Sequence, residues 1–325
     1  MRSVCVIGLG LIGGSVLRAA AAAGRTVWGA TGSTADSDAA AADGFAVASM
    51  TEALKRAADE DALVVLAVPL PAVDEVLRQV ADVAPHCLLT DVVSVKGPVA
   101  DAVARSAPET RFAGGHPMAG TSASGWSAST ADLFRGAAWV VVADDDTDLT
   151  AWRAAADLAI DCGAHVVPVT ADEHDAAVAR ISHLPHVLAA VLASCGADGG
   201  PLALALAAGS FGDGTRVMGS RPELVLAMCE GNRPALLAAV DDALGKLGAA
   251  RGALASTGSL GATIRAGHAG RAKLVDIRSA DTERVTVDLT GRDAIDELQL
   301  VGVQGGRVVA FTGDIAIAEL PVLEH

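Results

Sequence analysis

Tyrosine is absent from this chain of 325 residues, and aromatic residues make up only 3% of it. Proton transfer must therefore depend on histidine, lysine, an acid, serine or cysteine, which excludes every mechanism built on a catalytic tyrosine. Hydrophobic residues still account for 51% of the chain. A chain of this length and composition favours two domains with sizeable aliphatic cores and room for a short appendage.

Positive charge is also scarce, with 24 lysines and arginines against 39 acids and a formal net charge of −15. This balance argues against nucleic-acid and anionic-membrane partners, because both reward basic surfaces. The five cysteines form no CxxC pair, as is typical of reduced thiols in the cytosol. No apolar run approaches the ~20 residues of a membrane helix, and the first predicted strand leaves no room for a signal peptide. We therefore expect a soluble, cytoplasmic protein, and we interpret 323–325 as the start of an expression tag.

Short apolar runs alternate with alanine-rich segments through the first half of the chain. This alternation predicts an α/β fold with a Rossmann-type doubly wound parallel sheet, covered by helices on both faces. The most apolar run, 62–68, fits a strand that is buried on both sides. We expect strands at 4–7, 26–29, 62–68, 88–92, 111–113, 138–143 and 164–169. Residues 1–170 are the predicted dinucleotide-binding domain.

The second half of the chain changes character after residue 170. Residues 171–266 predict an all-helical domain whose apolar content exceeds one amphipathic stripe, which favours a homodimer. After about Gly267 the pattern switches to the two-residue alternation of strands. Residues 267–325 thus predict a small β-rich C-terminal appendage of unknown role. Its strands are expected at 285–289, 298–303 and 308–311.

The pattern GxGxxG at Gly8, Gly10 and Gly13 lies between an apolar run and an alanine-rich helix. The first glycine permits the turn, the second lets the backbone approach a pyrophosphate, and the third lets the helix pack closely on the strand. The context predicts a bound nicotinamide or flavin dinucleotide. The residues expected to contact it are Gly8, Leu9, Gly10, Leu11, Ile12, Gly13, Thr31, Val68, Pro69 and Ser94.

The segment after the second predicted strand bears on the choice of cofactor. An NAD-specific site usually presents an acid to the ribose there. Residues 27–33 contain no acid, and no lysine or arginine that could hold a 2′-phosphate. Thr31 and Ser33 suit either cofactor, and Asp36 is a later candidate for the acid. NAD is the predicted cofactor, with NADP as the alternative.

Two further loops place reactive side chains after predicted strands. The run 91–96, DVVSVK, carries Ser94 and Lys96, and the run 114–120, GGHPMAG, fixes His116 on a glycine- and proline-rich backbone. Ligands of open parallel sheets bind beyond the carboxyl ends of the strands, so these side chains are expected beside a ligand. A plainer interpretation of Ser94 is a cap for the helix that starts near Lys96.

Taken together, these motifs resemble the prephenate/arogenate dehydrogenase family, oxidoreductases that complete tyrosine biosynthesis. The resemblance extends to about Arg265 and depends on GLGLIGGS at 8–15, AVP at 67–69, DVVSVK at 91–96, GGHPMAG at 114–120 and SHLPH at 182–186. It implies a Rossmann domain joined to a helical dimerisation domain. It also implies oxidative decarboxylation of prephenate to 4-hydroxyphenylpyruvate, with hydride transfer to NAD. The alternative is arogenate, which would give tyrosine directly.

The resemblance also implies roles for individual residues. His116 would draw off the proton of the substrate's ring hydroxyl as hydride leaves, and Ser94 would orient its imidazole. Arg216 would hold a substrate carboxylate, with Asp213 supporting it, although Arg180, Arg221 and Arg233 compete for that role on sequence alone. His186 would contact the substrate from the helical domain. Thr121 and His183 complete the candidate substrate-binding residues.

Several alternatives stay open on sequence alone. His183 and His186 could join His116 or Asp175 around a metal, but their spacing and Pro185 speak against this, and no metal is predicted. A β-hydroxyacid or imine reductase would need a lysine or acid in the helical domain, where lysine is nearly absent. A non-catalytic dinucleotide sensor would lack the substrate residues found here. Ser122 lacks an acid that some relatives carry, so substrate choice and tyrosine inhibition stay undecided.

Overall fold

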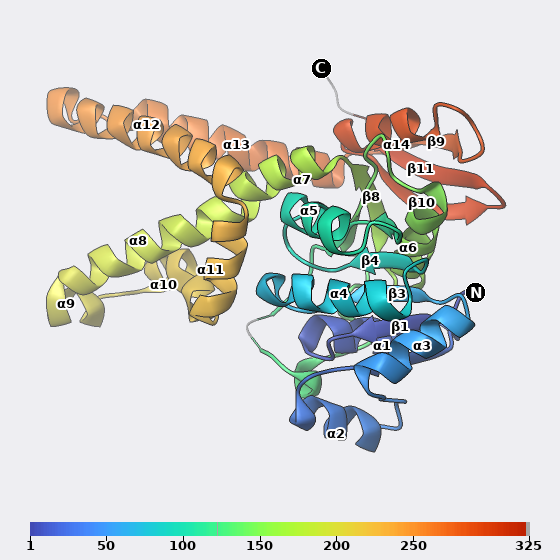
Figure 1. Cartoon of the computed structure of the whole chain (residues 1–325). Helices are drawn as coiled ribbons and strands as arrows, with labels where there is room; N and C mark the ends of the chain where they lie inside the picture. Colours follow the sequence, from blue (N-terminus) through green and yellow to red (C-terminus); the bar gives the residue numbers. More distant parts are fainter. Residues whose placement is uncertain (122, 323–325) are drawn as a thin grey trace.

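The computed structural model describes residues 1–121 and 123–322, so Ser122 and the proposed tag at 323–325 lie outside the described residues. Five parallel strands form the first sheet, in the order β2-β1-β3-β4-β5 (Figure 1). Their bounds are β1 Val4–Ile7, β2 Val27–Ala30, β3 Leu63–Leu66, β4 Leu88–Asp91 and β5 Arg111–Ala113. The accompanying helices are α1 Leu11–Ala22, α2 Thr34–Ala42, α3 Met50–Asp59, η1 Leu70–Ala72, α4 Val73–Val83 and α5 Gly97–Ser106.

Two hydrophobic clusters lie on the two faces of this sheet. Within β1, Val4 and Val6 belong to one cluster, whereas Cys5 and Ile7 belong to the other. Alternate side chains of a strand point to opposite faces, so a strand buried in both clusters must be apolar throughout. This explains why the central strands could be predicted from their sequence.

A single parallel bridge between Gly29 and Val47 adds a sixth position beside β2. With Val47 counted as a vestigial strand, the order becomes the 3-2-1-4-5-6 arrangement of the Rossmann fold. The predicted doubly wound sheet is therefore confirmed. The switch point, where such folds bind ligands, lies between the carboxyl ends of β1 and β3.

A second, mixed sheet of six strands has the order β6-β7-β8-β10-β11-β9. Its strands are β6 Gly115–Pro117, β7 Ala138–Val142, β8 His165–Val169, β9 Thr282–Asp288, β10 Arg307–Thr312 and β11 Ile315–Pro321. The predicted strands at 138–143 and 164–169 thus form, but in this sheet. Because β10 pairs with β8, the C-terminal strands extend the nucleotide-binding part of the chain.

The extra C-terminal strands are confirmed, but the strand predicted at 298–303 is wrong. This segment lies in helix α14, Ala294–Val303, which buries Ala294, Leu298 and Val301. Spacings of four and three residues place these side chains on one helical face. A Cβ at Gly302 would lie 1.6 Å from the carbonyl oxygen of Pro168, so only glycine allows α14 to pack this closely on β8.

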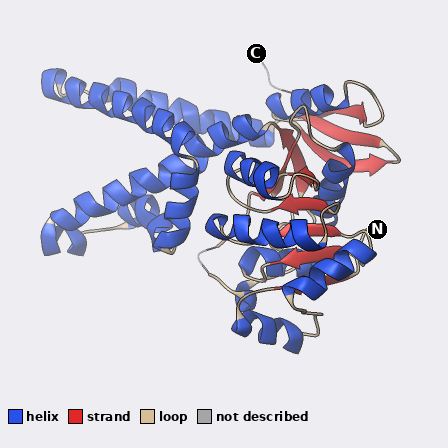
Figure 2. Cartoon of the chain, viewed as in Figure 1, coloured by secondary structure: helices blue, strands red, loops and turns tan. Residues whose placement is uncertain are grey.

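The confirmed helical part projects from the sheets as an arm without strands (Figures 1 and 2). Its elements are α7 Ala171–Val178, the π-helix η3 Ala179–His183, α8 Leu184–Asp198, α9 Gly200–Ala205, α10 Gly209–Thr215, η4 Arg216–Gly219, α11 Pro222–Gly231, α12 Arg233–Thr257 and α13 Gly261–Ser279. The boundary predicted at 266/267 is wrong, because α13 continues to Ser279. Gly267 and Gly270 lie inside this helix, where glycine is tolerated at a modest cost.

The continuous helical segment 171–198 is long and apolar enough to cross a membrane by length and composition, with a mean hydropathy of 1.4 in its most apolar window. The prediction that no segment reaches this length was therefore wrong. Pro185 does not end the helical segment, because it lies in the first turn of α8, directly after the π-helix η3. Helices that are buried between subunits have the same composition.

Candidate active site

The glycine loop after β1 shows why each of its three glycines is needed. Gly8 has φ +102°, and a Cβ there would lie 2.4 Å from the carbonyl oxygen of Ala67. A Cβ at Gly13 would lie 1.9 Å from the carbonyl oxygen of Gly8. At Gly10, by contrast, a Cβ would meet no described atom within 4 Å. The first and third glycines thus allow protein packing, whereas the second faces open space into which a ligand fits.

Helix α1 presents its amino end to the same space. The N-cap is Gly10, which provides no side-chain hydrogen bond, and the first turn contains no acid. The amides of Leu11, Ile12 and Gly13 precede the first possible intrahelical bond, so they can bind an anion. Val68 borders the loop, because its Cγ1 would lie 3.1 Å from a Cβ at Gly8. These residues fit the pyrophosphate of a dinucleotide.

Two of the other predicted cofactor residues contribute differently. The side chain of Leu9 is fully buried in the core, so only its backbone can face a ligand. Pro69 follows Val68 and is exposed. The loop after β3 therefore lies beside the glycine loop at the switch point.

The end of β2 carries hydroxyl groups and no available acid. The Thr31 hydroxyl accepts a hydrogen bond from the Ser33 amide at 3.2 Å, and the Ser33 side chain caps α2. The late candidate Asp36 accepts a hydrogen bond from the Trp126 amide at 2.7 Å. Asp36 therefore anchors the loop around Trp126, which leaves Thr31 and Ser33 at the expected position of the ribose.

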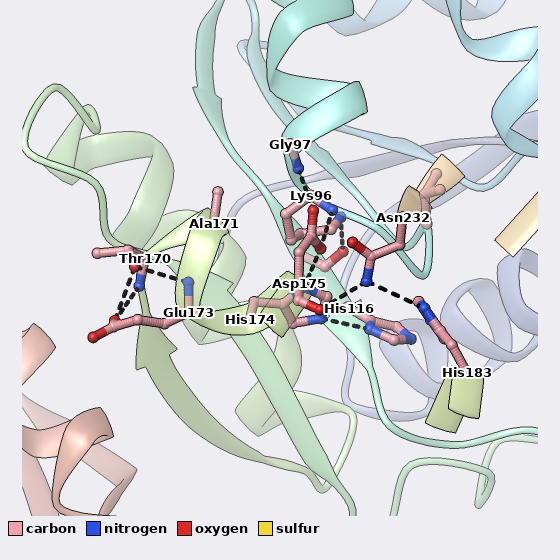
Figure 3. A network of polar contacts seen from close by, with 12 residues as sticks. Lys96, Gly97, His116, Thr170, Ala171, Glu173, His174, Asp175, His183 and Asn232 are labelled. Carbon is pink, nitrogen blue, oxygen red and sulfur yellow. Dashed lines mark hydrogen bonds and ion pairs between the residues drawn. The ribbon is translucent and has the colours of Figure 1, made fainter. Parts of the chain in front are cut away.

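His116 lies on β6 and takes part in a chain of side-chain contacts (Figure 3). Its Nδ1 is 2.8 Å from Nε2 of His174, and Nδ1 of His174 is 2.8 Å from Oδ1 of Asp175. The two imidazoles meet edge to face, with their centroids 5.1 Å apart. His174 and Asp175 lie on α7, whose first turn is fixed by a capping box between Thr170 and Glu173.

A buried ion pair supports the backbone just before His116. The Lys96 ammonium donates to the Asp91 carboxylate and, at 2.5 Å, to the Gly115 carbonyl. The Asp91 carboxylate also accepts hydrogen bonds from the amides of Gly115 at 3.0 Å and Val93 at 2.9 Å. Burial lowers the pKa of Lys96, although the neighbouring Asp91 opposes this. The sequence predicted Lys96 at this edge, and the structure makes it a buried support for β6.

Asp175 joins the helical part to the nucleotide-binding part. Its two carboxylate oxygens accept hydrogen bonds from the amides of Lys96 and Gly97, both at 2.9 Å, at the start of α5. Its carbonyl accepts a hydrogen bond from the Asn232 side chain at 2.7 Å, and that amide nitrogen lies 3.2 Å from Nδ1 of His183. Three helices, α5, α7 and α12, therefore meet around this acid.

The imidazoles at this junction favour their neutral forms. Burial holds the pKa of His116 well below its ordinary value, and the proximity of Lys96 and of two further titratable imidazoles, His174 and His183, lowers it further. Burial also lowers the pKa of His174, against the opposing hydrogen bond to Asp175. The pKa of His183 falls to about 4, again chiefly through burial. A neutral imidazole can accept a proton from a substrate.

The sequence predicted that Ser94 orients His116, and the structure gives a different answer. Within the described residues the Ser94 hydroxyl forms no hydrogen bond, and His174 occupies the position at Nδ1 of His116. Ser94 does not cap α5 either, because the N-cap is Lys96 and has no side-chain bond. Sequence reasoning missed His174 altogether and considered Asp175 only as a metal ligand.

The two histidines of the SHLPH motif differ in their surroundings. His186 donates a hydrogen bond from Nδ1 to the Ser182 carbonyl at 2.8 Å, which leaves its Nε2 as an acceptor. His183 is fully buried, and its Nε2 has no hydrogen-bond partner among the described residues. His183 therefore belongs to the junction with Asn232. Residues 1–121 and 123–322 contain no cluster of three or more groups that could hold a metal.

The remaining substrate candidates are exposed. Arg216 lies on η4, which packs against α8, the helix of His186. In the described structure its guanidinium forms no ion pair, so the predicted support from Asp213 is not formed. Arg180, a competitor, pairs with Asp242 at 2.6 Å. Thr121 accepts a hydrogen bond from the Ala123 amide at 3.2 Å.

Comparison with known proteins assigns both parts of the chain. Residues 15–168 match the family described as prephenate dehydrogenase, nucleotide-binding domain, and residues 170–258 match prephenate dehydrogenase, dimerization domain. A prephenate dehydrogenase from Lactococcus lactis is 32% identical over 67% of this chain, which spans about 61% of that relative's length. A cyclohexadienyl dehydrogenase from Zymomonas mobilis is 32% identical over 78% of this chain and 89% of its own length.

Solved structures share the whole arrangement. A provisionally named prephenate dehydrogenase from Corynebacterium glutamicum superimposes with a TM-score of 0.88 at 43% identity, covering 94% of this chain and 98% of its own. Prephenate dehydrogenase from A. aeolicus, in complex with hydroxyphenyl propionate and NAD+, gives a TM-score of 0.74 at 20% identity. The match covers 85% of this chain and 98% of that one, and supports the fold.

Proposed function

The chain belongs to the prephenate dehydrogenase family, and on that premise we propose that it oxidises prephenate to 4-hydroxyphenylpyruvate with NAD. The observation that carries the proposal is His116, a neutral imidazole held in the middle of the short strand β6 in the nucleotide-binding part. Arogenate is the second candidate, because the Z. mobilis relative is named for cyclohexadienyl substrates in general.

The glycine loop fits the proposed cofactor. Gly10 leaves space for the pyrophosphate, and the amides of Leu11, Ile12 and Gly13 would hold it at the positive end of α1. Thr31 would contact the ribose, and Val68, Pro69 and Ser94 would border the cofactor's other end. NAD, when bound, supplies the hydride acceptor. The lack of a basic residue in 27–36 favours NAD over NADP.

His116 performs the proton transfer in this proposal. The substrate's ring hydroxyl gives its proton to the imidazole while hydride leaves the same carbon. The bond to the ring carboxylate then breaks, carbon dioxide departs, and its electron pair makes the ring aromatic. His116 returns the proton to the phenolic oxygen, so no proton is gained or lost overall. Aromatisation drives the reaction, and the protein contributes chiefly position and this one proton transfer.

The helical part would hold the substrate. Arg216 offers a free guanidinium, which can bind a carboxylate through two parallel hydrogen bonds. His186 presents Nε2 from the adjacent helix α8, because its Nδ1 is engaged with Ser182. Thr121 and Asp213 would contribute at the edge of the site. His183 would act indirectly, through the Asn232 side chain that also binds the Asp175 carbonyl.

The proposed active protein is a cytoplasmic homodimer without nucleic-acid or membrane partners. Four leucines of α12 are each more than half exposed: Leu237, Leu244, Leu247 and Leu254. Residues 170–258, which include α12, match a dimerization domain, and a second copy would cover such a face. A monomer in sedimentation equilibrium would contradict this assembly.

The test is a cofactor-reduction assay that crosses NAD and NADP with prephenate and arogenate. Prephenate with NAD should give the highest kcat/KM, and His116→Asn should lower kcat by about 10²–10⁴-fold without weakening cofactor binding. His165→Asn on β8 is the matched control and should turn over normally. Unchanged turnover in His116→Asn would refute the assigned base. Turnover of hydroxyacids or imines alone, or cofactor binding without any turnover, would refute the proposed reaction.

A further inference from the structure

His116 and His174 share a nitrogen-to-nitrogen contact, which links their protonation. Their Nδ1 and Nε2 atoms are 2.8 Å apart, a hydrogen-bond distance. A neutral imidazole has one N–H donor and one acceptor nitrogen, so one ring must donate and the other must accept. The tautomer of His174 therefore decides the tautomer of His116.

Asp175 sets the direction of this contact. Burial alone would raise the pKa of Asp175, but hydrogen bonds from His174, Gly97 and Lys96 outweigh it and hold the pKa below its ordinary value. An ionised carboxylate only accepts hydrogen bonds, so Nδ1 of His174 must carry a proton. Nε2 of neutral His174 is then an acceptor, and Nδ1 of His116 must donate to it. This leaves Nε2 of His116 with its lone pair free.

We propose that His174 and Asp175 are positioning residues that fix His116 as the tautomer with an unprotonated Nε2, the atom that takes the substrate's proton. The inference rests on the proposed function, in which His116 is the base. Its starting point is the contact geometry, which assigns to His174 the orienting role that the sequence predicted for Ser94. Neither His174 nor Asp175 is placed in contact with the substrate.

The same chain of contacts stabilises His116 after it has accepted the proton. The charged and titratable groups around the two rings come from four elements: Asp91 on β4, Lys96 before α5, Asp175 on α7 and His183 on η3. The Lys96 ammonium disfavours a second positive charge, but it is already paired with Asp91. Asp175 accepts a hydrogen bond from Nδ1 of His174, and Nε2 of His174 accepts one from His116. The second hydrogen bond becomes charge-assisted, and therefore stronger, when His116 becomes an imidazolium.

Asp175 can act in this way only when the two parts of the chain are docked. Its carboxylate is held by the amides of Lys96 and Gly97, which belong to the nucleotide-binding part, whereas His174 and Asp175 belong to α7. His116 comes from β6. The tautomer of the base therefore depends on the junction, where His174 lies 58 positions from His116 in the chain and Asp175 lies 79 positions from Lys96.

The experiment compares two substitutions of His174 with a matched control. His174→Leu removes the acceptor for Nδ1 of His116, and we expect kcat to fall roughly 10- to 100-fold with little change in KM. His174→Gln keeps an amide oxygen at about the same reach and should restore most of kcat. His165→Gln on β8 should match the wild type. Thermal melting and NAD binding verify that each variant is folded.

The pH dependence of kcat distinguishes a positioning role from a merely structural one, because a residue that only supports the fold would not shift it. His174→Leu removes the hydrogen bond that stabilises His116 as an imidazolium, so the pKa of His116, which burial already lowers, should fall further. The loss of kcat on acidification should therefore begin at a lower pH than in the wild type. In the His116→Asn background, His174→Leu should cost nothing further in kcat, because it acts through the missing imidazole.

A tautomer measurement separates this inference from the proposed function. Nitrogen-15 NMR of the ligand-free protein, with His116 assigned by its loss in His116→Asn, should show Nδ1 protonated and Nε2 unprotonated. The opposite tautomer, or unchanged kcat in folded His174→Leu, would overturn the positioning role even if His116 proves to be the base. If His116→Asn retains full turnover, the proposed function fails, and the NMR result alone decides whether His174 fixes the tautomer.

Discussion

Substitution of Gly10 by alanine should separate cofactor binding from folding. In the free protein the new Cβ meets nothing within 4 Å, and the backbone at φ −74° and ψ −161° is open to any residue. Alanine is a poorer N-cap than glycine by about 0.5–1 kcal/mol. A stiffer unfolded chain offsets this by about 0.4–1 kcal/mol. The free energy of unfolding should therefore change by less than about 1 kcal/mol.

Binding should respond much more strongly, because the methyl group occupies the space proposed for the pyrophosphate. Displacement of the phosphate loses at least one hydrogen bond between an amide of α1 and a charged oxygen, which is worth about 1.5–3 kcal/mol. At 1.4 kcal/mol per factor of ten, the Kd for NAD should rise roughly 10- to 150-fold. Isothermal titration calorimetry gives the Kd, and urea denaturation gives the stability.

Two other glycines provide the comparison. Gly13→Ala should lose stability as well as binding, because its Cβ would lie 1.9 Å from the Gly8 carbonyl oxygen and 2.7 Å from Cβ of Ala67. Gly245→Ala on α12, where a Cβ also meets nothing within 4 Å, should weaken neither NAD binding nor the stability of the fold. An unaltered Kd for NAD in Gly10→Ala would show that the second glycine does not face the cofactor, and the argument from the loop would be wrong.

Arg216→Ala should raise KM for the substrate by roughly 10- to 150-fold, because a charge-assisted contact to a carboxylate is worth about 1.5–3 kcal/mol. Arg180→Ala, which removes only an exposed pair with Asp242, should leave KM unchanged, and equal KM values for both variants would transfer the role to another arginine. Stability should fall as the pH drops from about 6.5 towards 4, because the unfolded chain binds protons there that His183, with its pKa lowered to about 4, excludes in the folded state. Urea titrations at several pH values should show a shallower dependence in His183→Gln, whereas His86→Gln at an exposed site should keep the wild-type slope; a slope unchanged in His183→Gln would refute this cause.

The nucleotide-binding part could be predicted because its information is local. The glycine spacing fixes a strand, a turn and a helix, and β1 and β3 are apolar on both faces because both are covered. The segment 298–303 was ambiguous, because a short apolar run fits both the periodicity of a helix and that of a strand. Its neighbours decide the outcome: as a helix the segment buries Ala294, Leu298 and Val301 on one face, and Gly302 lets it approach the Pro168 carbonyl closely. The length of α13 was missed because two internal glycines resemble a helix end.

The candidate site could be predicted where one motif carries several of its residues. His116 and the three glycines were found in this way; the glycines lie between the end of β1 and the first turn of α1, and His116 lies within the short strand β6. The partner of His116 lies 58 positions away, and no spacing rule connects the two. Ser94 was assigned to that role by resemblance, and the contact to His174 shows why a motif alone does not fix the partner of an imidazole.

Asp175 is the residue whose burial could have pointed to this partnership. Acids in the first turns of a helix are expected to face water, as Asp172 and Glu173 do, yet Asp175 is only 8% exposed. An ionised carboxylate that is taken from water needs donors, since without them burial costs several kcal/mol. Its donors are the amides of Lys96 and Gly97 together with His174. Docking of the two parts of the chain therefore satisfies this acid, and the same docking orients the imidazole of His116.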